Sequence, residues 1–170
     1  QNNNLDDELT VIENLLIYGQ LHGLTSIQAR ENILHWATIL EFSEIFKKYP
    51  YELAYGYQRK VLLARALVHD AEVLLLDEPT KGMDPHSKST VWNVLDKLQK
   101  KKTIIFTTQD FTEAERYADR IAILHDGNIK MDGTLDRLIE STHGLTCYRL
   151  VFKEEPPEEF MNQLKQNPRV

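Results

Sequence analysis

The pattern of apolar and polar positions divides the chain into a helical N-terminal part and a mixed part of strands and helices. From residue 10 to about residue 70, apolar residues recur at helical spacing and no strand pattern is present. Thr10 and Glu13 form a capping-box pattern at the first helix start. The pattern predicts helices from Thr10, from Ser26 to about Leu40, and from near Tyr57 to Val68.

Strand signals begin after residue 70. The apolar run Val73–Leu76 predicts a buried strand, and two more strands are predicted at Thr103–Thr108 and Arg120–Leu124. The helices between them are predicted to start at Asp84-Pro85 and at Asp110, the latter with Glu113 at the capping-box position. This alternating order predicts an α/β fold with parallel strand pairing and right-handed crossovers.

The pattern changes again towards the C-terminus. Asp126-Gly127 is a hairpin turn signal after the third predicted strand. Beyond Ser141, the sequence predicts a strand at Leu145–Glu154, a break at Pro156-Pro157 and a short helix at Glu158–Gln166. We interpret this segment as the start of a small additional domain.

Composition narrows the class of protein without deciding its function. The 170 residues are 42% hydrophobic, enough for one ordinary domain with a core. No apolar run approaches the roughly 20 residues that a membrane-spanning helix needs, so we expect any membrane association to run through another polypeptide or segment. The net charge of −6 argues against a general nucleic-acid surface. The single cysteine, Cys147, excludes an internal disulfide and fits a reducing compartment.

The end of the first predicted strand carries the main chemical signal. Asp77 and Glu78 follow the apolar run directly, at the carboxyl end where parallel sheets bind ligands. A carboxylate at Asp77 suits Mg²⁺, and Glu78 would point to the other side, where it could orient or deprotonate water. The alternative is a strand that ends in solvated acids before a helix cap. Pro79-Thr80 and the Gly82-x-Asp84-Pro85 turn favour the nucleotide-site interpretation.

Further motifs occur in a fixed order around this strand. They are Gln1 with Asn4-Leu5-Asp6, Leu53-Ala-Tyr-Gly-Tyr57 before Gln58-Arg-Lys60, Val73–Glu78, Gly82-Met-Asp84, Thr107-Thr-Gln109 before Glu113-Ala-Glu115, and Asp119-Arg-Ile121. Over residues 1 to about 140, the sequence resembles the nucleotide-binding domain of ATP-binding cassette (ABC) transporters. It is most similar to exporter cassettes of the drug, nodulation-factor and lipid type.

The resemblance implies a fold, a division into domains and a set of partners. The fold would be a partial P-loop NTPase (ABC ATPase) core with a parallel sheet, plus an α-helical subdomain. Residues 1–70 would form the Q-loop and helical subdomain, residues 71–140 the Walker B to switch-loop part of the core, and residues 141–170 a C-terminal extension. The implied partners are ATP with Mg²⁺, a second nucleotide-binding domain in a homodimer or heterodimer, and a transmembrane permease, at the cytoplasmic face of the membrane. No nucleic-acid partner is expected.

The resemblance also implies roles for individual residues. Asp77 and Gln1 would hold the magnesium shell, Glu78 the attacking water, and Gln109 the γ-phosphate. Asp84 would contact the opposite cassette. The signature segment would face the partner's ATP with Ala54, Tyr55, Gly56 and Tyr57.

This sequence departs from the family pattern at points that affect turnover. It contains no Gly-x-x-x-x-Gly-Lys-Ser/Thr phosphate loop. We therefore expect a fragment that starts at the Q-loop, forms a half-site and binds ATP weakly. Ala54 replaces the signature serine, and the Tyr55 side chain is expected to obstruct close approach of backbone to phosphate. Gln109 stands where the family has histidine, so it can donate a hydrogen bond but cannot become cationic.

Alternatives remain open at the level of the sequence. Leu53–Gly56 could be an ordinary loop before a helix, and Gln109 a polar strand end without ligand contact. The cassette could also be a regulatory or ATP-binding protein with little hydrolysis, an interpretation that the altered signature and Gln109 motivate. A third class is the ABC ATPases of DNA repair or translation, which need coiled-coil insertions or a second cassette, and neither is visible in these residues.

Overall fold

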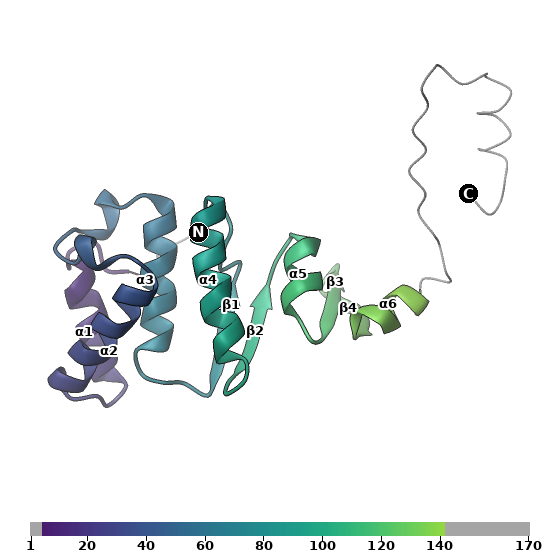
Figure 1. Ribbon diagram of the computed structural model, residues 1–170, viewed down its shortest axis with the longest axis horizontal. Helices are drawn as coiled ribbons and strands as arrows, with labels where there is room; N and C mark the ends of the chain where they lie inside the picture. The colour runs from purple at the N-terminus through teal and green to yellow at the C-terminus, as the bar shows by residue number, and fades with distance from the viewer. Residues whose placement is uncertain (1–4, 142–170) are drawn as a thin grey trace, which may run out of the picture. The chain divides into compact units, whose positions relative to one another are not determined.

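The computed structural model describes residues 5–141, which divide into two compact units between Tyr117 and Ala118. The first unit contains, in chain order, α1 (Val11–Leu21), α2 (Ser26–Ile39), the 3-10 helices η1 (Ser43–Ile45) and η2 (Pro50–Glu52), α3 (Tyr55–Leu67), β1 (Val73–Asp77), α4 (Pro85–Leu98), β2 (Thr103–Thr107) and α5 (Phe111–Tyr117) (Figure 1). The second unit contains β3 (Ile121–His125), β4 (Asn128–Gly133) and α6 (Leu135–Ser141).

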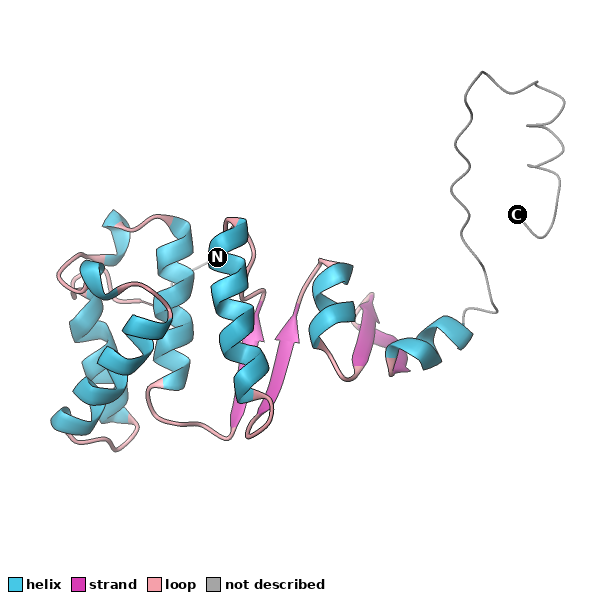
Figure 2. Ribbon diagram, viewed as in Figure 1, coloured by secondary structure: helices cyan, strands magenta, loops and turns pink. Residues whose placement is uncertain are grey.

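Helices α1, α2 and α3 pack around one apolar core. Val11, Leu15, Ile33, Phe42 and Val61 are fully buried in it. Figure 2 shows only helices and loops in this part of the chain, as the periodicity predicts. The three helices have 11, 14 and 13 residues, and helices of this length are only marginally stable in isolation, so their mutual packing supplies most of their stability.

Local capping explains where these helices begin. The Glu13 carboxylate accepts a hydrogen bond of 2.8 Å from the Thr10 amide, which confirms the predicted capping box. Helix α3 begins at Tyr55, two residues before the predicted start. The reason is that the Ala54 carbonyl already accepts hydrogen bonds from the amides of Tyr57 and Gln58.

Strands β1 and β2 form a parallel pair, as predicted, with Val73 opposite Thr103 and Asp77 opposite Thr107. Helix α4 connects them, and its Val91, Trp92 and Leu95 are buried beside Leu74 of β1. The other face of the pair is open: Leu75 and Ile105 are 74% and 56% exposed. The apolar character of both faces follows from the sequence, because strands of parallel sheets are usually covered on both sides.

The second unit contains the predicted hairpin. Its β3, the third predicted strand, pairs antiparallel with β4. Asp126 and Gly127 both have positive φ, 50° and 71°, which matches the tight turn that joins antiparallel strands. Arg120 Nε donates to Asp132 Oδ1 across the hairpin at 2.8 Å.

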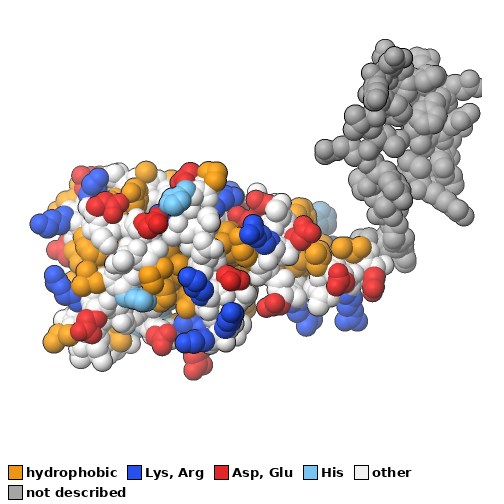
Figure 3. Space-filling view, in the orientation of Figure 1, with side chains coloured by type: hydrophobic (Ala, Val, Ile, Leu, Met, Phe, Trp, Pro, Cys, Tyr) orange, Lys and Arg blue, Asp and Glu red, His pale blue; other side chains and the backbone are white. Residues whose placement is uncertain are grey.

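The surface carries charges of both signs. Figure 3 shows Lys and Arg side chains interspersed with Asp and Glu side chains on the visible face of the first unit. None of the helices within residues 5–141 is long and apolar enough to cross a membrane. Gln1, Cys147 and the elements predicted beyond Ser141 lie outside the described residues.

Candidate active site

The carboxyl ends of β1 and β2 bring the first candidate residues together. Asp77 and Thr107 are partners in the strand register, and the Thr107 hydroxyl donates to Asp77 Oδ1 at 2.5 Å. The same hydroxyl accepts from the Glu78 amide at 3.0 Å. One threonine of β2 therefore fixes both the proposed metal ligand and the backbone of the proposed catalytic residue.

The chemistry of Asp77 fits a magnesium ion. Its carboxylate is exposed at the sheet edge, and carboxylate oxygens are ligands that Mg²⁺ prefers. Among residues 5–141, no group of three or more His, Cys, Asp or Glu side chains could hold a metal ion. A single carboxylate is compatible with Mg²⁺, because this ion usually has few protein ligands and keeps several waters and phosphate oxygens.

Glu78 occupies a strained backbone position. Its φ is +47°, in the left-handed region that residues other than glycine rarely adopt. Such strain persists only where surrounding contacts hold it, and it gathers at functional sites. The side chain is largely covered, and its Oε1 accepts from Lys81 Nζ at 2.9 Å. Glu78 is therefore paired with a cation three residues along its own loop.

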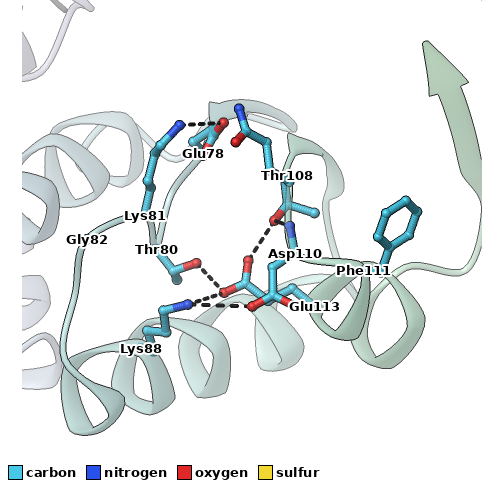
Figure 4. Close-up of a pocket in the computed structure, with 10 residues that line it drawn as sticks. Glu78, Thr80, Lys81, Gly82, Lys88, Thr108, Asp110, Phe111 and Glu113 are labelled. Atoms are coloured by element: carbon cyan, nitrogen blue, oxygen red, sulfur yellow. Dashed lines mark hydrogen bonds and ion pairs between the residues drawn. The ribbon is translucent and has the colours of Figure 1, made fainter. Parts of the chain in front are cut away.

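A pocket of about 410 Å³ opens between the loops that follow β1 and β2 (Figure 4). Both candidate catalytic residues, Glu78 and Gln109, line it. The other lining residues are Thr80, Lys81, Gly82, Lys88, Thr108, Asp110, Phe111 and Glu113. The carboxyl ends of β1 and β2 therefore lie side by side, as expected. The Gln109 side chain lines the pocket and is exposed to solvent.

At the base of this pocket, Glu113 of α5 is the centre of a hydrogen-bond network. Its carboxylate accepts from the hydroxyls of Thr80 at 2.7 Å and Thr108 at 2.9 Å, and from Lys88 Nζ at 3.1 Å. Burial raises the pKa of Glu113, but these hydrogen bonds outweigh burial and hold the pKa below its ordinary value. The same ion pair raises the pKa of Lys88.

Glu113 does not play the role that the sequence pattern predicted. Asp110 does cap α5, because its Oδ1 accepts from the Thr112 amide at 3.0 Å. The Asp110 amide, however, donates to Thr108 Oγ1 and not to Glu113. Glu113 turns inward, on the same helix face as the half-buried Tyr117 four residues later. A charged residue on the apolar face of a predicted helix is the sequence feature that could have indicated a buried hydrogen-bond network at Glu113.

Asp84 is used locally as a helix cap. Its Oδ1 accepts from the amides of His86 and Ser87, both at 3.0 Å, at the start of α4. Hydrogen bonds from Ser87 are the main cause that lowers the pKa of the Asp84 carboxyl. The cap orders the turn between Gly82 and Pro85, the segment for which the family resemblance implies a contact with a second cassette.

The altered signature residues lie at the N-terminus of α3. The Tyr55 ring rests on the loop after β1, and a Cβ built on Gly82 would be only 2.9 Å from Tyr55 Cε1. The Tyr55 hydroxyl accepts from Arg59 Nε at 2.8 Å. The Tyr57 hydroxyl donates to Glu44 at 2.6 Å, which lowers the pKa of Glu44. A Cβ added at Gly56 would meet no atom within 4 Å, so the backbone there is open to approach.

A protein-family model and curated relatives match the sequence of this chain. The family model described as ABC transporter matches residues 1–81. The chain is 37% identical over 169 residues to Nod factor export ATP-binding protein I of Rhizobium sp. (strain N33), covering 97% of this chain and 54% of that protein. It is 41% identical over 148 residues to the protein of that name from Burkholderia lata, covering 85% and 48%. The chain spans about half the length of the curated relatives it matches.

Solved structures show the same fold. A dimeric bacterial ABC transporter cassette matches with a TM-score of 0.72 at 28% identity, over 79% of this chain and 60% of that chain. The same cassette in a post-hydrolysis state bound to ADP and Pi matches with a TM-score of 0.70. An ATP-binding subunit of an ABC transporter matches over 95% of this chain with a TM-score of 0.75, at 23% identity, which supports the fold alone.

Proposed function

We propose that this chain, which matches the ABC transporter family model over residues 1–81, serves in the ATP-binding subunit of an ABC exporter. There it would help to couple ATP binding and hydrolysis to transport across a membrane. The relatives at 37% and 41% identity are Nod factor export ATP-binding proteins, which favours export as the direction. The subunit would act at the cytoplasmic face of the membrane, through a transmembrane partner and a second cassette.

The observation that carries this proposal is the shared pocket at the ends of β1 and β2. The pocket is lined by Glu78, to which we assign the water, and by Gln109, to which we assign the terminal phosphate. Asp77, the last residue of β1, immediately precedes Glu78. Magnesium bound at Asp77, with Gln1 as a second ligand, would neutralise phosphate charge. Glu78 would orient the water or accept its proton, and Gln109 would donate an amide hydrogen bond to the phosphate.

The remaining predicted residues fit contacts with a second cassette. The N-terminus of α3, with Ala54, Tyr55, Gly56 and Tyr57, would face the partner's nucleotide, because helix N-termini favour phosphate. Asp84, which orders the turn before α4, would contact the opposite subunit. We assign residues 1–70 to the helical subdomain, residues 71–140 to the ATPase core and residues 141–170 to a C-terminal extension.

A cassette with little hydrolysis is the second candidate. Ala54 lacks the hydroxyl that a serine would offer, the Tyr55 ring is 40% exposed beside the Gly82 loop, and Gln109 cannot become cationic. If the active form is a homodimer, both composite sites carry these changes. In a heterodimer, the partner could contribute one unaltered site.

The test is ATP hydrolysis by the protein expressed from its complete gene, with and without its membrane partner. Glu78→Gln should lower kcat by about 100-fold or more while ATP still binds, because the carboxylate that handles water is lost. Glu72→Gln, an exposed glutamate just before β1, is the matched control and should keep wild-type turnover. Hydrolysis that survives Glu78→Gln would exclude the assigned role. Absence of hydrolysis in the wild type, with ATP bound, would support the regulatory alternative.

A further inference from the structure

We propose that Glu113 is a positioning residue that holds the loops after β1 and β2 in one arrangement, so that Glu78 and Gln109 face the same pocket. This inference rests on the proposed function, since it concerns the alignment of the two residues assigned to water and phosphate. Glu113 would not itself touch the substrate. It would act through the two threonines that it binds.

The contacts of Glu113 reach three segments of the chain. Oε1 accepts from Thr80, two residues after Glu78, and Oε2 accepts from Thr108, the residue immediately before Gln109. Lys88 of α4 binds Oε1 as well. Figure 4 shows the dashed lines from Thr80, Thr108 and Lys88 converging on Glu113.

Burial makes this arrangement difficult to change. Thr80 is 1% exposed and Glu113 is 8% exposed, so neither polar group can exchange its partner freely for water. A movement of one loop alone would leave a hydroxyl or a carboxylate oxygen buried without a partner, which is unfavourable. The two loops are therefore expected to keep their relative position or to move together.

The negative charge of Glu113 is matched by the surrounding groups. Lys88 is the cation of the network, and it also lies 3.7 Å from Asp110 at the start of α5. A glutamine at position 113 would keep the size but offer one acceptor oxygen and no charge for Lys88. It would therefore satisfy only part of the network.

The decisive variants remove one hydroxyl and monitor the opposite loop. Thr80→Val removes a donor from the loop after β1, and we expect amide hydrogen exchange to become roughly tenfold faster in residues 107–112 of the other loop. Thr108→Val should have the reciprocal effect on residues 78–83. Thr80→Ser keeps the donor and should restore wild-type exchange. Exchange in α1–α3 serves as the internal reference for folding.

The kinetic arm uses the protein expressed from its complete gene. Glu113→Gln and Thr80→Val should lower kcat by about 10- to 100-fold with KM for ATP changed little, because alignment and not binding is lost. Glu115→Gln, an exposed neighbour on the same helix, should leave kcat unchanged. Equal kcat for wild type and Thr80→Val would overturn the positioning role while hydrolysis itself stands.

The two arms separate the inference from the proposed function. If the wild type proves not to hydrolyse ATP, the proposed activity fails, and hydrogen exchange still decides whether Glu113 couples the loops. Faster exchange confined to the loop that carries the mutation would overturn the coupling. If Glu113→Gln does not fold, the two valine variants and the serine variant decide the question.

Discussion

At the scale of single residues, the contact between Tyr55 and Gly82 links the altered signature to the loop after β1. Gly82 has φ +72°, and a Cβ there would approach Tyr55 Cε1 to 2.9 Å. Arg59 also contacts the ring, with its guanidinium carbon 4.9 Å from the ring centroid. The bulky residue at the signature is thus accommodated by a glycine on another segment. The effect of a tyrosine at position 55 on stability therefore depends on the size of the residue at position 82.

Gly82→Ala should therefore lower the free energy of unfolding by about 1–2 kcal/mol, from the positive φ and from the clash with Tyr55. Gly23→Ala is the matched control, since Gly23 has φ +86° but no atom within 4 Å of the Cβ position. It should show the backbone cost alone. In a Tyr55→Ala background, the cost at position 82 should fall to that of the control. Urea unfolding measures the free energy of unfolding of each variant. If Gly82→Ala and Gly23→Ala lower it equally in the wild-type background, the contact between Gly82 and Tyr55 is contradicted.

At the scale of elements, the helical part depends on close approach between helices. Gly19 is buried on α1, and a Cβ there would lie 3.0 Å from Ala29 Cβ of α2 and 3.1 Å from Val68 Cγ1 at the end of α3. Glycine weakens a helix by itself, but here it lets three helices meet. The periodicity identifies α1 as a helix, and the packing explains why a glycine lies within it.

Gly19→Leu should destabilise the protein by about 1–3 kcal/mol, because a larger side chain must push α2 and α3 away. Gln20→Leu introduces the same residue one position along, on the exposed face of α1, and should change stability by no more than about 0.5 kcal/mol. Thermal or urea unfolding distinguishes the two. A Gly19→Leu protein as stable as the control would show that the helices are not in close contact there.

At the scale of the whole molecule, buried and paired titratable groups make stability depend on pH. Burial, followed by the charges of His22 and Lys102, lowers the pKa of His69, which lies in a ring cluster with His22 and Tyr18. Glu113 is held below its ordinary pKa by its hydrogen bonds. Both shifts mean that the unfolded chain takes up protons before the folded chain does as pH falls.

Stability should therefore fall in two stages on acidification. The first begins near pH 6.5, about the ordinary pKa of histidine, and belongs to His69; the second begins near pH 4.5 and includes Glu113. His69→Phe keeps a ring beside Tyr18 and His22 but cannot be protonated, so it should remove the His69 contribution to the first stage. Urea midpoints measured from about pH 7.5 to about pH 3.5 test this, and an unchanged first stage in His69→Phe would exclude His69 as its cause.

Much of the local structure was predictable from the sequence. The capping box at Thr10, the strand that starts at Val73, the helix start at Asp84 and the Asp126-Gly127 turn were all predicted and are all present. The strand was predicted to end at Leu76, and it ends one residue later, at Asp77. Each of these features depends on residues within a few positions of one another, where spacing and side-chain chemistry favour one local conformation. The placement of Asp77 and Glu78 at a strand end follows from the same local information.

The tertiary structure decided which distant side chains meet. Asp110 and Glu113 have capping-box spacing, yet Glu113 turns to Thr80, 33 residues away, because burial in the fold offers it several donors at once. The contact of Tyr55 with Gly82 was likewise not predicted. The spacing of residues in the sequence indicates which hydrogen bonds can form between near neighbours. It does not show which distant groups become buried together. That burial determines which polar partners a side chain keeps, and here it joins the two loops of the candidate site.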